Sequence, residues 1–379
     1  MGGFVTALVG LLVPRLTLID RLDYTRAALV QFAFHSSYLL FALPITALLV
    51  RTGYMRAIAA GLGVMTLACL ALGGAAWIGS YPLLLLALLA LSTGITFLQI
   101  AANVVQPLVA AEGRGAARLT LLQGFNSVGT VLAPLVGAGF LLQLGALGRL
   151  SMALPFGAAA AVLAWLCVVF WRARDLLAAH PAPHRLPLAQ LARVLRARRL
   201  AWGSVAMFGY VGAEVTIGSL LANYLALPGI IAADPASAGR LVSLYWGGAM
   251  LGRFAGALGL ARVAPARLLA GVALGAVLLV GIASQAHGIM GAVALIAVGL
   301  CNAIMYPTIF ALALPEDRGL APYASMILCM AVVGGAVVPL AAGALADRVG
   351  LAAALGLPLL CYLGIAAFAL MIALPTAKR

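Results

Sequence analysis

The sequence predicts an all-α membrane protein with twelve transmembrane helices arranged as two six-helix bundles. Of its 379 residues, 65% are hydrophobic and 8% are charged, with a mean hydropathy of +1.15, whereas soluble domains carry about 25% charged residues. Runs of about 20 apolar residues are candidates for transmembrane helices, and such runs fill nearly the whole chain. One long polar and basic segment separates six of them from the other six. This composition excludes a soluble globular protein.

Hydropathy defines the twelve spans, which lie near residues 2–19, 27–50, 55–78, 82–111, 117–143, 150–171, 202–227, 240–262, 266–285, 288–314, 320–346 and 351–374. We therefore expect an N-terminal bundle over residues 1–171, a cytoplasmic linker over 172–201 and a C-terminal bundle over 202–379. Because the first span begins at residue 2, we also expect that a cytoplasmic leader is missing from the sequence.

The positive charges predict the orientation. A net charge of +14 would suggest a nucleic-acid partner in a soluble protein, but cytoplasmic loops of membrane proteins are enriched in lysine and arginine. With a cytoplasmic N-terminus, 17 of the 23 Lys and Arg residues fall inside, seven of them in the linker. Both termini are therefore expected in the cytoplasm, and no nucleic-acid partner is expected.

The two halves share a pattern of glycine and proline. Span five contains GTVLAPLVG (129–137), and span eleven contains GGAVVPLAAG (334–343). Asn103 precedes Pro107 by four residues in span four, and Asn302 precedes Pro307 by five in span ten. Matched positions of glycine and proline in equivalent spans indicate a parallel internal repeat, which is the plan of major facilitator transporters. The alternative is that Gly and Pro are simply common in membrane helices.

Five amides lie in residues 93–130, within otherwise apolar spans: Gln99, Asn103, Gln106, Gln123 and Asn126. Spacings of three and four residues place them on one face of each of two consecutive helices. Amides offer both donors and acceptors, which suits a ligand made of hydroxyls. The alternative is that they form hydrogen bonds that hold helices together. Two such faces on neighbouring helices favour a polar cavity.

Two ionisable residues lie inside spans and are candidates for ion coupling. Glu214 is the one carboxylate well inside a span, so it is a candidate proton carrier or hydroxyl acceptor, with a structural acid as the alternative. Asn223 would share its cavity only if the helix opens near Gly218, because nine residues place the two on opposite faces. His35 in span two can be protonated near neutral pH, or it can be a hydrogen-bonded neighbour.

Other polar and aromatic residues complete the candidate set. Trp246 can stack on the apolar face of a sugar ring, or anchor the span at the interface. Asn302 and Tyr306 are expected on one face of span ten. Arg253 lies toward the cytoplasmic side of span eight, where it can snorkel or gate. The sequence contains no nucleophile constellation, metal-ligand cluster or phosphate loop, so we expect no enzyme activity, no metal and no cofactor.

Six motifs carry a family resemblance, in order along the chain: LQIAAN (98–103), RLTLLQGFNSVGT (118–130), YVGAEVTIGSLLANYL (210–225), YWGGAMLGRF (245–254), NAIMYPTIF (302–310) and GALADRVG (343–350). They resemble the glucose/galactose branch of the fucose:proton symporter family, within the major facilitator superfamily. The resemblance implies uptake of a glucose-, galactose- or fucose-like hexose across the bacterial inner membrane by alternating access. We expect a monomer in the lipid bilayer. Efflux of a sugar or another neutral metabolite, and a sugar sensor that does not transport, are the alternatives.

The resemblance also implies departures from the symporter pattern. The fucose branch has an aspartate in the first span and a glutamate in the fourth, where this chain has Gly10 and Gln99. Val104 stands where the family usually has proline, and His35 where it tends to have another aromatic residue. These losses predict altered or absent proton coupling, with a proton or sodium as candidate ions. The remaining coupling candidates are Glu214 and His35.

The expected sugar-binding set combines residues from both halves: Gln99, Asn103, Gln123, Asn126, Glu214, Trp246, Asn302 and Tyr306.

Overall fold

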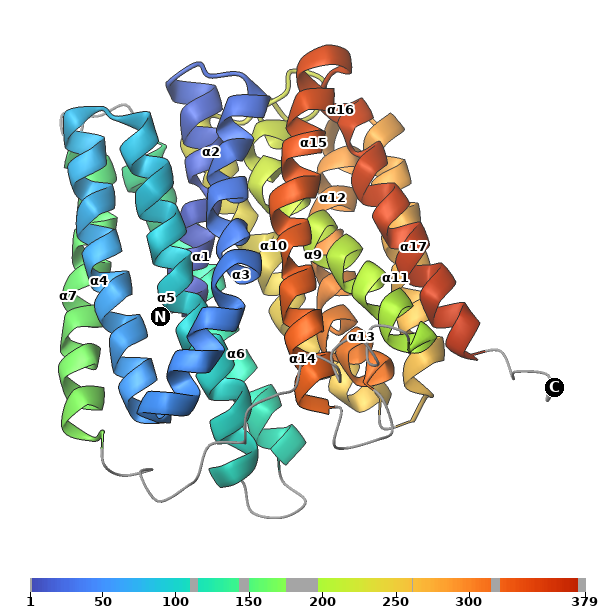
Figure 1. The fold of residues 1–379 in the computed structure, drawn as a ribbon. Coiled ribbons are helices and arrows are strands. Elements are labelled where there is room, and N and C mark those ends of the chain that lie inside the picture. The colour runs from blue at the N-terminus through green and yellow to red at the C-terminus, as the bar shows by residue number, and fades with distance from the viewer. Residues whose placement is uncertain are drawn as a thin grey trace.

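The computed structural model describes residues 2–109, 115–142, 150–174, 197–260, 262–314 and 321–373. All regular secondary structure in these ranges is helical. Long helices run roughly side by side, with α1–α7 on one side of the molecule and α9–α17 on the other (Figure 1). This arrangement confirms the all-helical prediction for the described residues.

The N-terminal helices begin with an irregular first segment, in which a π-helical stretch, η1, follows Pro14. The elements on this side are α1 (Gly2–Gly10), α2 (Leu12–Pro14), η1 (Arg15–Ile19), α3 (Tyr24–Thr52), α4 (Tyr54–Ile78), α5 (Tyr81–Val109), α6 (Gly115–Leu141) and α7 (Leu150–Arg172).

The C-terminal elements are α9 (Arg198–Leu225), α10 (Pro235–Leu260), α11 (Pro265–Gln285), α12 (Gly288–Asn302), α13 (Met305–Ala313), α14 (Ala321–Met330), η3 (Ala331–Val333), α15 (Gly334–Val349), α16 (Leu351–Ala354) and α17 (Gly356–Ala373).

Ten segments of the described residues are long and apolar enough to cross a bilayer, and a shorter apolar segment covers Asn126–Leu141. Large apolar side chains are exposed on the outward faces of these helices, for example Leu67 at 69% and Ile289 at 73%. Exposed apolar surface on this scale would be unstable in water. The chain is therefore a multi-pass membrane protein.

Proline explains why the tenth hydrophobic span is broken into two helices. The α-helix stops at Asn302 and resumes at Met305, just before Pro307. A proline ring clashes with the carbonyl of the residue four positions earlier, which here is Ala303. As a consequence, Asn302 and Tyr306 belong to two different helices of the same span.

The two groups of helices meet along α3 with α15 and along α6 with α10. Gly343 allows α15 to approach α3 closely, because a Cβ at this position would lie 2.6 Å from the carbonyl oxygen of Tyr24. Beside it, the Asp347 carboxylate accepts hydrogen bonds from the backbone N–H groups of Tyr24 and Thr25, both at 2.8 Å, and from the Thr25 hydroxyl at 2.5 Å. The end of α15 thus holds the beginning of α3.

Candidate functional site

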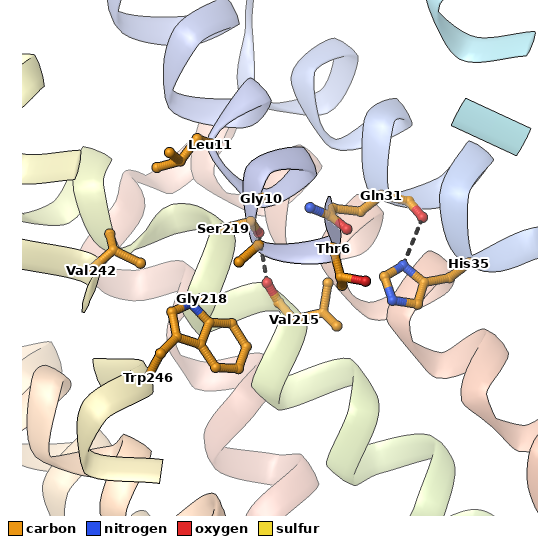
Figure 2. Close-up of a pocket in the computed structure, with 11 residues that line it drawn as sticks. Thr6, Gly10, Leu11, Gln31, His35, Val215, Gly218, Ser219, Val242 and Trp246 are labelled. Carbon is orange, nitrogen blue, oxygen red and sulfur yellow. Dashed lines mark hydrogen bonds between the residues drawn. The ribbon is translucent and has the colours of Figure 1, made fainter. Parts of the chain in front are cut away.

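A small cavity lies between the N-terminal and C-terminal helices. Its wall combines residues of α1, α3, α9 and α10 (Figure 2). The lining residues are Thr6, Ala7, Gly10, Leu11, Gln31, His35, Val215, Gly218, Ser219, Val242 and Trp246. Its volume of about 40 Å³ holds on the order of three water molecules. Because both groups of helices contribute, their relative movement would change its size and access.

The α3 wall of the cavity is polar. Gln31 and His35 are four residues apart and therefore lie on one face of α3. The His35 Nδ1–H donates to the Gln31 carbonyl oxygen at 3.1 Å, because a carbonyl can only accept. A neutral imidazole then carries its free lone pair on Nε2, which lies against Gly335 of α15. His35 is 5% exposed, so this coupling candidate is enclosed between α3 and α15.

The opposite wall is largely apolar and centres on Trp246. The indole ring lies over Gly218 of α9, where a Cβ would come within 3.0 Å of the ring. Tyr245 packs edge-on against it, with ring centroids 5.1 Å apart and planes at 79°. Val215 and Val242 complete this wall. The cavity therefore has a polar side and an aromatic side.

Glu214 belongs to a hydrogen-bonded network beside the cavity. The Tyr210 hydroxyl lies 2.8 Å from a Glu214 carboxylate oxygen and 3.3 Å from the carbonyl oxygen of Asn302. The Asn302 side-chain amide donates to the Tyr245 hydroxyl at 2.7 Å and accepts from the Tyr362 hydroxyl at 2.8 Å. Asn302 is only 1% exposed. In this conformation its amide is hydrogen-bonded to the hydroxyls of Tyr245 and Tyr362.

Tyr306, the last member of the expected C-terminal set, extends the same cluster. Its ring lies 6.3 Å from that of Tyr210 in a tilted arrangement and 6.3 Å from that of Phe310 in a stacked one. Glu214 and Tyr306 are both half-buried, so each keeps some accessible surface. The contribution of Glu214, Asn302 and Tyr306 to binding stays a prediction.

Helix α9 passes Gly218 without a break, so Glu214 and Asn223 remain on different faces. The Asn223 side-chain amide donates to the Thr17 hydroxyl of η1, which joins α9 to the first segment of the chain. Asn223 therefore connects the two groups of helices, and the condition for its sharing a cavity with Glu214 is not met.

The amide stretch of α5 and α6 is described in part. Asn126 is exposed, and its Oδ1 accepts a hydrogen bond from the backbone N–H of Gly3 at 2.7 Å, one of the first N–H groups of α1, which have no partner within that helix. Gln99 is half-buried on α5. The side chains of Asn103, Gln106 and Gln123 lie outside the described residues.

Arg253 connects this stretch to the C-terminal helices. Its guanidinium donates from α10 to the hydroxyl of Ser127 on α6, one residue after Asn126. The charge of Arg253 also acts on the Glu214 carboxylate. The cation is therefore bonded to the amide stretch and lies near enough to the half-buried Glu214 for its charge to act on it.

Sequence reasoning missed three residues of this region. Tyr210 could have been found, because it precedes Glu214 by one helical turn. Gln31 could have been found as an amide inside an apolar span, four residues before His35. Tyr362 gave no signal, because its role depends on α17 packing against α9 and α11, which brings the Tyr362 hydroxyl to the Asn302 side chain.

Curated proteins of known name are similar to almost the whole chain, while no protein-family model matches it. A glucose/galactose transporter of Brucella abortus is 37% identical over 98% of this chain and 91% of its own length. A putative glucose/galactose transporter of Helicobacter pylori is 34% identical over 97% and 93%. The L-fucose-proton symporter of Escherichia coli is 30% identical over 95% and 87%.

The solved structures that superpose on this chain are also transporters. The crystal structure of a variant of the Escherichia coli fucose:proton symporter FucP superposes with a TM-score of 0.74, at 26% identity, covering 98% of this chain and 95% of that one. FucP in its outward conformation gives 0.71, at 26% identity and 98% coverage of both chains. The fold and the cavity between its two groups of helices therefore define a transporter of the major facilitator superfamily. Within it, the chain belongs to the fucose:proton symporter family, in the glucose/galactose transporter branch.

Proposed function

We propose that this protein transports a glucose-, galactose- or fucose-like hexose across the bacterial inner membrane by alternating access. The observation that carries the proposal is the cavity between the N-terminal and C-terminal helices, with amide and hydroxyl groups on one wall and Trp246 on the other. Hydroxyls of a sugar match the polar wall, and the apolar face of its ring matches the indole. The names of the relatives point to the same substrate class.

In this proposal the chain has twelve spans, organised as a bundle over residues 1–171, a cytoplasmic linker over 172–201 and a bundle over 202–379. Both termini are cytoplasmic, as the distribution of arginines favours, and the protein acts as a monomer. The bundles rock about the central site so that it faces one side of the membrane at a time. A sugar entering the cavity would displace its water and require the walls to separate.

The residues proposed to bind the sugar are Gln99, Asn103, Gln123 and Asn126 from the N-terminal bundle, and Glu214, Trp246, Asn302 and Tyr306 from the C-terminal bundle. Glu214 and His35 are the proposed coupling residues, with a proton or sodium as the ion. With Gly10 and Gln99 at the positions of the symporter acids, we propose that proton coupling is altered or absent.

Counterflow in proteoliposomes tests the proposal. Vesicles loaded with unlabelled D-glucose, D-galactose or L-fucose are diluted into a trace of the same sugar in labelled form. A transporter gives transient accumulation of label against its gradient, whereas a sensor binds without exchange. Absence of counterflow with all three sugars, in protein that is folded and correctly inserted, would reject hexose transport.

A further inference from the structure

Helix α3 carries a buried amide to which neither the sequence motifs nor the names of the relatives assign a role. Gln31 on α3 is 3% exposed, and its side chain lines the cavity together with Thr6 and Gly10 of α1 (Figure 2). Its backbone carbonyl accepts from His35, but its side-chain amide makes no hydrogen bond to any residue of the described ranges.

Burying an amide of this kind is unfavourable in free energy unless a ligand or a water molecule forms hydrogen bonds with it. A glutamine side chain offers two donors and an acceptor with two lone pairs. A polar group that is buried without partners destabilises the folded protein. Two other polar groups of the cavity are occupied: the Ser219 hydroxyl donates to the carbonyl of Val215 at 2.7 Å on its own helix, and the His35 Nδ1–H donates to the Gln31 carbonyl oxygen within α3. The Gln31 amide, with the Thr6 hydroxyl and the His35 Nε2 beside it, is therefore left to bind what enters.

The space in front of Gln31 is neutral and open. A Cβ added at Gly10 would meet no atom within 4 Å, so the first helix leaves room at the position where the fucose branch has its aspartate. Among the described residues, the lining contains no carboxylate and no Lys or Arg. Trp246 lies across the cavity from α3 (Figure 2). A neutral ligand with hydroxyls on one edge and an apolar face fits this combination.

We infer that Gln31 is a specificity-determining residue of the transporter, whose amide binds hydroxyl groups on one edge of the sugar while Trp246 covers the ring's apolar face. This inference rests on the proposed function and adds a binding residue on α3 to it. The amide faces the part of α1 where Gly10 leaves space and Thr6 adds a hydroxyl.

Gln31→Met tests the inference, because methionine keeps the length and unbranched shape of the side chain and removes its donors and acceptor. Phe32→Leu is the matched control, since Phe32 is the next residue of α3 and is 40% exposed on the outer face. Gln31→Glu is a second variant that retains acceptor oxygens. Counterflow half-saturation is measured for D-glucose and for each of its monodeoxy analogues, with folding checked by size-exclusion chromatography in detergent.

We expect the parent and Phe32→Leu to discriminate against the deoxy analogue that lacks the bound hydroxyl. Gln31→Met should bind D-glucose about tenfold more weakly and lose discrimination at that hydroxyl alone, while discrimination at the other positions persists. Loss at a single hydroxyl is a result that general damage to α3 would not produce. Gln31→Glu should retain discrimination at the same position, because a carboxylate still accepts from a hydroxyl.

Two results would overturn the inference in different ways. If the parent exchanges glucose and Gln31→Met retains the same affinity, or loses affinity equally for every analogue, Gln31 does not bind hydroxyls although transport stands. If the parent exchanges none of the sugars, the proposed function is wrong and the inference falls with it. If Gln31→Met fails to fold, a Gln31→Glu variant that treats all the deoxy analogues alike would also reject the inference.

Discussion

Removing the Asp347 carboxylate should open the end of the molecule where α3 begins. Its two oxygens accept three hydrogen bonds from Tyr24 and Thr25, and these bonds join α15 of the C-terminal helices to α3 of the N-terminal ones. The carboxylate also lies at a helix N-terminus, where the first N–H groups lack partners and the helix dipole favours negative charge. The structure is therefore held closed at this end by contacts that separation of the two groups of helices would break.

The size of the effect follows from the number of bonds and their exposure. Asp347 is exposed, so each bond is placed at the low end of the usual range, about 0.5 kcal/mol. Three such bonds sum to about 1.5 kcal/mol, which corresponds to roughly a tenfold change in a conformational equilibrium. Asp347→Ala should therefore increase about tenfold the population in which this end is open.

Labelling of a single cysteine measures that population. In a background without the five native cysteines, Val242→Cys places a thiol on the cavity wall, at a position that is 2% exposed. While the open state is a minority, the rate of reaction with a membrane-impermeant maleimide added outside right-side-out vesicles is proportional to its population. We expect labelling about ten times faster when Asp347→Ala is added.

Asp23→Ala is the matched control. Asp23 caps the same end of α3, accepting from the backbone N–H of Arg26 at 2.6 Å, but it does so within the N-terminal helices. Asp23→Ala should weaken the N-terminal end of α3 and leave the labelling rate nearly unchanged. Equal rates for Asp347→Ala and its parent would refute the reasoning, and so would equal acceleration by Asp23→Ala, which would assign the effect to helix fraying.

Three other variants address the amide stretch, coupling and the cavity. Asn126→Ala should weaken sugar binding to purified protein about tenfold, while the lipid-facing change Leu132→Ala should not; equal affinities would confine Asn126 to capping α1. Glu214→Gln should abolish any sugar accumulation driven by a pH gradient while counterflow persists, and surviving accumulation would move coupling to another residue or ion. Gly10→Asp should fold, because a Cβ there has no neighbour within 4 Å, and its carboxylate should make exchange vary with pH between about 4 and 7; a pH profile identical to the parent's would contradict this.

The helices could be predicted from sequence largely because hydrophobic length is a local property. The span expected at 55–78 is α4, Tyr54–Ile78, and that expected at 202–227 is α9, Arg198–Leu225. The interruptions were not predicted, although one has a visible cause in Pro307. The π-helical stretch after Pro14 and the 3-10 turn at Ala331–Val333 are departures that hydropathy does not register, since hydropathy reports composition and not backbone conformation.

The site was harder to predict because partners come from distant helices. Spacing placed Asn126 on a polar face, but the bond it accepts comes from Gly3, 123 residues away. Asn302 looked like a sugar ligand because it is an amide in an apolar span; Tyr245 and Tyr362 satisfy that amide, and nothing local to Asn302 indicates them. Gln31 differs from Asn302, because its side-chain amide has no hydrogen-bond partner among the described residues. Only the packing of the helices around Gln31 shows this.

The different surroundings of Gln31 and Glu214 indicate how a proton at Glu214 would act. The cavity in front of Gln31 has no carboxylate among its lining residues, whereas Glu214 contacts Tyr210, which also approaches the Asn302 carbonyl. Tyr210 has one hydroxyl proton to donate, and the shorter distance, 2.8 against 3.3 Å, assigns it to the carboxylate. A protonated Glu214 would no longer need that donor, so the hydroxyl could turn to Asn302, at the end of α12 next to the break before Pro307. A proton at Glu214 would then act by changing how α9 and α12 are joined.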